Sequence, residues 1–96
     1  SRIRDKQIYL LDEPETPLSF QNQLTLMAMI LDARKRGCQF IIATHSPVLT
    51  AIPDAKIYEI IDDTFVKTEY DDVTSIKLMR QFLNDKEQFL HHFDDL

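Results

Sequence analysis

Two short apolar runs stand out along the chain, Ile-Tyr-Leu-Leu at residues 8–11 and Phe-Ile-Ile-Ala at residues 40–43. Neither run alternates with polar residues, which is typical of strands inside a parallel sheet with both faces buried. Between them, residues 20–36 predict a helix, because apolar residues recur there at helical spacing. These apolar residues are Leu24, Met27, Ala28 and Leu31. Strand, helix and strand in this order predict a βαβ crossover, and therefore an α/β fold with a parallel sheet core.

The helix at residues 20–36 has recognisable ends in the sequence. Ser19 precedes it and predicts an N-cap, because a serine hydroxyl can accept a hydrogen bond from a free N–H group of the first turn. Gly37 follows it and can adopt the left-handed conformation that ends many helices. After the second strand, Ser46 predicts the cap of a short helix over residues 48–51.

The second half of the chain predicts a β-hairpin followed by helices. Residues 56–61 and 64–70 read as two strands joined by Asp62 and Asp63. Residues 73–83 then predict a helix. A last short helix follows, which Asp85 caps together with Gln88.

We expect the whole chain to form one domain. A chain of 96 residues with 44% apolar residues can bury one modest core. Residues 1–52 would form the crossover unit, and residues 53–96 the hairpin and the C-terminal helices.

Composition limits the possible function classes. Gly37 is the only glycine, whereas a P-loop or a dinucleotide-binding turn needs several, so any nucleotide site in these residues can be only partial. The formal net charge of −5 argues against broad nucleic-acid binding. The single cysteine, Cys38, excludes an internal disulfide framework and favours a reducing, cytoplasmic compartment. No apolar run approaches the roughly 20 residues of a membrane span, so we expect no membrane segment.

Polar chemistry follows both predicted strands. Asp12 and Glu13 come directly after the first strand, where ligands of parallel α/β sheets usually bind. One carboxylate suits a hydrated Mg²⁺ ion, and the other could activate a water for attack on a phosphoryl group. Pro14 should restrict Glu13 to extended geometry. The plainer alternative is a strand that ends in an exposed acidic turn.

His45 follows the second strand in the sequence Thr44-His45-Ser46. If the two strands are parallel neighbours, His45 lies at the same sheet edge as Asp12 and Glu13. An imidazole there could bond a terminal phosphate or orient the attacking water. The alternative is a structural histidine whose hydrogen bonds stay within the protein.

These motifs, taken in order, resemble those of ABC-type ATPases. Residues 8–15 resemble the Walker B motif, residues 16–19 occupy the place of the D-loop, and residues 40–47 resemble the switch strand and H-loop. The sequence Asp-Glu-Pro-Glu, followed by Leu-Ser and later by Thr-His-Ser-Pro, is most similar to the motifs of soluble AAA/ABC-like predicted ATPases. No Walker A motif, signature motif or Gln loop is present, so the resemblance implies the C-terminal part of a longer ATPase domain with a partial P-loop NTPase fold.

The resemblance implies a role for each matching residue. Asp12 would hold Mg²⁺ mainly through water, Glu13 would be the catalytic base, and His45 would sense the γ-phosphate of ATP. Ser19 lies in the D-loop, and the resemblance implies that it contacts nucleotide across a dimer interface, although transporter subunits usually have Asp at this position. Leu18 would lie near that interface too, which implies a homodimer of the full-length protein.

Three functions remain open from the sequence. The first is part of an ATP-hydrolysing enzyme, inactive without its P-loop half, with ATP and Mg²⁺ both requiring that half. The second is a non-catalytic protein-interaction module that retains the fold. The third is an ATPase that acts in DNA repair or defence, for which the net charge of these residues offers no support.

Overall fold

A computed structural model describes residues 6–94, and the chain divides into two compact units after Ala55. The first unit contains β1 (Ile8–Asp12), α1 (Phe20–Lys35), β2 (Gln39–Ala43) and the short 3₁₀ helix η1 (Leu49–Ala51). The second contains β3 (Tyr58–Ile61), β4 (Thr64–Lys67), the 3₁₀ helix η2 (Tyr70–Asp72), α2 (Thr74–Asn84) and α3 (Lys86–His91). The expectation of a single domain over residues 1–96 stays a prediction.

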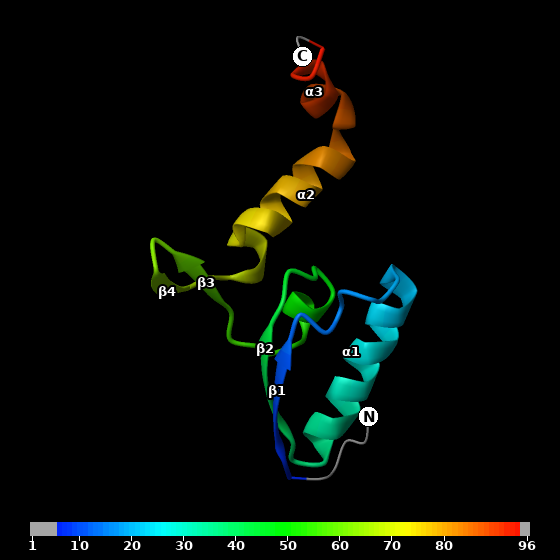
Figure 1. Ribbon diagram of the computed structural model, residues 1–96, viewed down its shortest axis with the longest axis vertical. Coiled ribbons are helices and arrows are strands. Elements are labelled where there is room, and N and C mark those ends of the chain that lie inside the picture. Colours follow the sequence, from blue (N-terminus) through cyan, green and yellow to red (C-terminus); the bar gives the residue numbers. More distant parts are fainter. Residues whose placement is uncertain (1–5, 95–96) are drawn as a thin grey trace. The chain divides into compact units, whose positions relative to one another are not determined.

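The first unit is built on a parallel pair of strands. β1 and β2 pair in parallel, in a register that places Ile8 beside Gln39 and Asp12 beside Ala43. α1 connects them and lies alongside the pair (Figure 1). The predicted parallel pairing of these strands is therefore confirmed, and the strands end together at one edge of the sheet.

The described residues of the first unit, 6–55, cover one face of this sheet. Leu11, Phe40 and Ile42 pack against a core of Ile30, Leu49 and Ile52. On the other face, the side chains of Ile8, Leu10 and Ile41 are 67%, 74% and 58% exposed. The prediction that both strands are buried on both faces is wrong here, because α1 and η1 pack on the same face.

The ends of α1 agree with the prediction, but its buried face does not. The hydroxyl of Ser19 accepts a hydrogen bond from the Asn22 N–H at 3.2 Å, and Gly37 adopts a left-handed φ of 90°. Ile30 and Ala33 are the buried residues of the helix, whereas Leu24, from the predicted face, is 39% exposed. The helix is apolar over most of its circumference, so its periodicity does not select one face.

The second unit contains the predicted hairpin. β3 and β4 pair antiparallel, and Asp62 and Asp63 form the turn with positive φ values of 49° and 61°. Two successive left-handed residues are typical of the tight turn whose twist matches that of a hairpin. Asp85 caps α3 as predicted, since its carboxylate accepts a hydrogen bond from the Gln88 N–H at 3.3 Å.

Candidate functional site

The polar residues that follow β1 and β2 form the strand-end cluster, which we define as Asp12, Glu13, Glu15, Thr44 and His45. Asp12 is the last residue of β1 and pairs with Ala43, the last residue of β2. The N–H of Glu13 donates to the Ala43 carbonyl at 2.7 Å, so the two chains are still bonded where they leave the sheet. The crossover therefore brings residues 12–15 and 44–45 together.

Glu13 and His45 face each other in this cluster. The Nε2 atom of His45 lies 3.9 Å from the Oε1 atom of Glu13. Both side chains are open to solvent, with exposed fractions of 83% for His45 and 52% for Glu13. A carboxylate and an imidazole at this separation can act on one bound molecule, because both can be reached from outside.

Glu13 adopts a backbone conformation that differs from the prediction. Its φ is 45°, in the left-handed region, and not in the extended region expected before Pro14. The Pro14 ring disfavours the right-handed helical region for the preceding residue, and the left-handed region is a separate allowed one. The turn then fixes this choice, since the Glu13 carbonyl accepts from the Thr16 N–H at 3.2 Å.

Glu15 joins the two halves of the cluster, and no separate role was predicted for it from the sequence. Its Oε1 atom accepts a hydrogen bond from the Thr44 hydroxyl at 2.7 Å, and its Oε2 atom accepts one from the His45 N–H at 2.9 Å. The sequence feature that could have indicated a role for Glu15 is its place as the third acidic residue in Asp-Glu-Pro-Glu, directly after a strand. Both carboxylate oxygens are thus used to hold the segment that carries His45.

These bonds alter the ionisation of Glu15. Partial burial acts to raise its pKa, and the hydrogen bonds from the Thr44 hydroxyl and the His45 N–H act to lower it. The bonds prevail, so the pKa of Glu15 lies below its ordinary value. Glu15 is therefore an anion at neutral pH and acts as a hydrogen-bond acceptor.

A second polar bridge links α1 to the segment after β2. The hydroxyl of Ser46 donates to the side-chain carbonyl of Gln23 at 2.6 Å and accepts from the Val48 and Leu49 N–H groups at 3.1 and 3.2 Å. The amide of Gln23 also donates to the Leu18 carbonyl at 3.3 Å. Gln23 therefore ties the loop before α1 to the loop after β2.

The structure brings some predicted site residues together and leaves one apart. Asp12, Glu13 and His45 lie at the same edge of the sheet. Ser19 instead uses its hydroxyl to cap α1. Among the described residues, no bond links Ser19 directly to Glu13 or His45.

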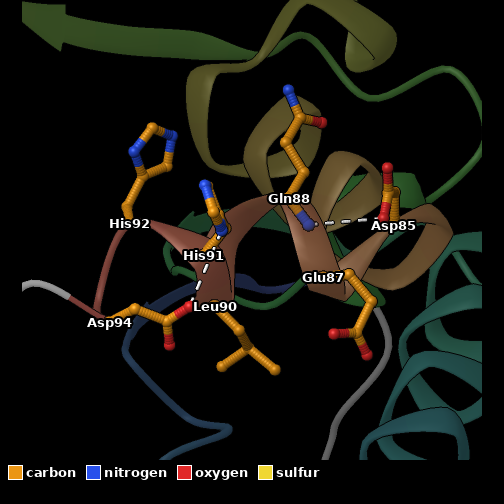
Figure 2. A pocket seen from close by; sticks show the side chains of 7 residues that line it. All are labelled: Asp85, Glu87, Gln88, Leu90, His91, His92 and Asp94. Atoms are coloured by element: carbon orange, nitrogen blue, oxygen red, sulfur yellow. Dashed lines mark hydrogen bonds and ion pairs between the residues drawn. The ribbon is translucent and has the colours of Figure 1, made fainter.

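Other acidic and histidine side chains gather at the C-terminal helix. Figure 2 shows a hollow lined by Asp85, Glu87, Gln88, Leu90, His91, His92 and Asp94. Its ion pair joins His91 Nδ1 to Asp94 Oδ2 at 3.6 Å, with both side chains largely exposed. Within residues 6–94, no three His, Cys, Asp or Glu side chains form a group that could hold a metal ion by themselves.

Comparison with known families matches the residues that carry the strand-end cluster. The family described as "AAA domain, putative AbiEii toxin, Type IV TA system" matches residues 2–51, just over half of the chain. The chain belongs to this AAA domain family. A comparison with curated proteins found no match.

Membership of the AAA domain family gives the crossover unit a general function. The matched segment is part of an ATPase-like nucleotide-binding module, and its parallel strands and helix are compatible with a partial P-loop NTPase fold. The family match ends at Ala51, within η1, so it includes every residue of the strand-end cluster. The helices of residues 6–94 are all too short or too polar for a membrane span.

Proposed function

We propose that this AAA domain chain supplies the hydrolytic part of an ABC-like ATPase site. Residues 8–15 would act as Walker B, residues 16–19 as the D-loop and residues 40–47 as the H-loop. The observation that carries the proposal is the 3.9 Å approach of His45 Nε2 to Glu13 Oε1 at the shared end of two parallel strands. This arrangement supports catalysis because ligands of such sheets bind beyond the carboxyl ends of the strands.

The Asp12 carboxylate fits a role in holding Mg²⁺. It is exposed at the end of β1 and takes part in none of the ion pairs formed among the described residues. Mg²⁺ binds proteins through one or two carboxylates, keeps several waters and shares substrate phosphates, so it does not need a cage of side chains. Bound there, Mg²⁺ would neutralise charge on the phosphates of ATP.

Glu13 and His45 would divide the chemistry between them. Glu13 accepts a proton from the attacking water as the new O–P bond forms on the γ-phosphorus. The bond between the γ-phosphorus and the bridging oxygen breaks, and that oxygen leaves with ADP. His45 donates a hydrogen bond to a γ-phosphate oxygen and stabilises the charge there.

The phosphate-binding loop must come from other residues, because Gly37 is the only glycine of this chain. We expect the 96-residue chain alone to be inactive. The active assembly would be a homodimer of the full-length protein, with Leu18 and Ser19 near the two-fold interface. The family description also names a putative toxin, and a role in defence would use the same ATPase site.

The test is the replacement Glu13→Gln in the assembled ATPase that contains this chain and a P-loop. It keeps the size of the side chain and removes the base, so kcat should fall by at least about 100-fold while ATP stays bound. Turnover is measured by phosphate release, and ATP retention by filter binding. Asp54→Asn is the control, since it removes another exposed carboxylate of the same unit.

Unchanged turnover in Glu13→Gln would show that Glu13 is not the catalytic base. The alternative, a non-catalytic interaction module, has one observation in its favour, the exposed apolar face of Ile8, Leu10 and Ile41. That alternative predicts partner binding that neither Glu13→Gln nor His45→Ala alters. It also predicts no ATP turnover in the assembled protein.

A further inference from the structure

One carboxylate of the strand-end cluster has no part in the proposed hydrolysis. Both oxygens of Glu15 are occupied by hydrogen bonds, one from the Thr44 hydroxyl at 2.7 Å and one from the His45 N–H at 2.9 Å. Glu15 is partly buried, whereas Glu13 is exposed. Glu15 therefore contacts the segment after β2.

The bonds to Glu15 extend through this segment. The Thr44 oxygen that donates to Glu15 also accepts from the Ser46 N–H at 2.9 Å. Ser46 is in turn buried, with an exposed fraction of 3%, and bonded to α1 through Gln23. Side-chain hydrogen bonds thus hold the residues on both sides of His45 to the turn after β1, through Glu15, and to α1, through Gln23.

The imidazole of His45, in contrast to its backbone, is largely open to solvent. It is 83% exposed, so little packing restricts it. Its direction depends on where the backbone of residue 45 is held. The His45 N–H is bonded to Glu15, which lies in the same turn as Glu13. Hydrogen bonds to an ionised carboxylate are shorter and stronger than those between neutral groups.

We propose that Glu15 is a positioning residue that holds His45 opposite Glu13 through the Thr44 hydroxyl and the His45 N–H. The inference rests on the proposed function, because it assigns Glu15 a task only if Glu13 and His45 act on one substrate. Glu15 touches no reacting atom. It contributes by keeping the imidazole within reach of the phosphate that Glu13 helps to hydrolyse.

The substitution Glu15→Ala tests this in the assembled ATPase. It removes both acceptor oxygens and should lower kcat by about 10- to 100-fold, because small displacements of a catalytic group have effects of this size. The KM for ATP should stay within about threefold, since Glu15 does not contact the nucleotide. Glu15→Gln keeps one acceptor oxygen for the His45 N–H, so its kcat should lie between those of the unsubstituted protein and Glu15→Ala.

A spectroscopic measurement on the 96-residue chain gives a second readout. In a proton–nitrogen correlation spectrum, Glu15→Ala should move the His45 amide signal upfield and speed its hydrogen exchange by at least about 10-fold, because a charge-assisted bond is lost. The signals of β1 and β2 away from the cluster should stay in place, which shows that the variant is folded. Asp54→Asn is the matched control and should leave the His45 amide unchanged.

The outcomes separate this inference from the proposed function. Normal kcat in Glu15→Ala, with kcat lost in Glu13→Gln, would overturn the positioning role alone. A His45 amide signal that does not respond to Glu15→Ala would overturn it too. If Glu13→Gln hydrolyses ATP normally, the proposed function fails, and the His45 amide measurement still reports whether Glu15 holds that segment. Should Glu15→Ala not fold, Glu15→Gln is decisive, and an unchanged kcat in it overturns the inference.

Discussion

Glu13 occupies the left-handed region with a φ of 45°, where residues with a side chain are disfavoured by roughly 1–2 kcal/mol. The bonds of Glu13 to the Ala43 carbonyl and the Thr16 N–H hold this conformation. The sequence could not predict it, because Pro14 restricts only the right-handed helical region and the partner at Ala43 comes from another strand. A strained backbone at the candidate base is consistent with a functional position.

Glu15 gives a pH-dependent prediction. Because its folded pKa lies below its ordinary value of 4.5, ionised Glu15 stabilises the fold above that pH, and the contribution is lost as the pH falls through the folded pKa. Glu15→Gln cannot ionise. The difference in unfolding free energy between the two proteins should therefore be greater at pH 7 than at pH 3, measured by urea denaturation with circular dichroism.

The same denaturation curves at pH 7 and pH 3 can also contradict this prediction. If the difference between the chain and Glu15→Gln is the same at both pH values, the Glu15 carboxylate does not gain stability from its ionised state. Asp54→Asn serves as the control for general effects of removing a negative charge from an acidic chain.

At the scale of elements, the bounds of α1 could be predicted and its orientation could not. The cap at Ser19 and the left-handed end at Gly37 depend on residues next to the helix, so both can be predicted from the sequence. The buried face depends on what the helix packs against. Ile30 and Ala33 are buried and Leu24 is partly exposed, because η1 and the sheet contact one side of a helix that is apolar on most sides.

The turn after β2 gives a prediction about stability. Ser46 is buried and its hydroxyl accepts from the N–H groups of Val48 and Leu49. Ser46→Ala leaves these groups without that acceptor and removes the donor to Gln23, so we expect a loss of about 1–3 kcal/mol in unfolding free energy.

Chemical denaturation of Ser46→Ala measures this loss. Ser75→Ala is the matched control, because Ser75 is exposed in the first turn of α2, and it should change stability by less than about 0.5 kcal/mol. Equal effects of the two substitutions would show that the Ser46 bonds contribute no more than a surface hydroxyl.

At the scale of the whole molecule, topology was predictable and the environment of the sheet was not. Parallel strands joined by a helix follow from the order of the apolar runs, and this order also explains why Glu13 and His45 meet. Four successive apolar residues in each strand, at 8–11 and 40–43, are typical of a sheet that is covered on both sides. The first unit covers one side, and a sequence pattern cannot say which chain provides the other cover.

The uncovered face of β1 and β2 predicts self-association of the 96-residue chain. Ile8, Leu10 and Ile41 present adjoining apolar side chains on neighbouring strands, and such patches associate in water. Sedimentation velocity should show a mean mass that rises with concentration, and Leu10→Thr should reduce that rise, since threonine suits a strand and is less apolar. Leu10→Ile keeps the apolar surface and should associate as the unsubstituted chain does. A monomer at all concentrations, or equal association of Leu10→Thr and Leu10→Ile, would contradict a role for this face.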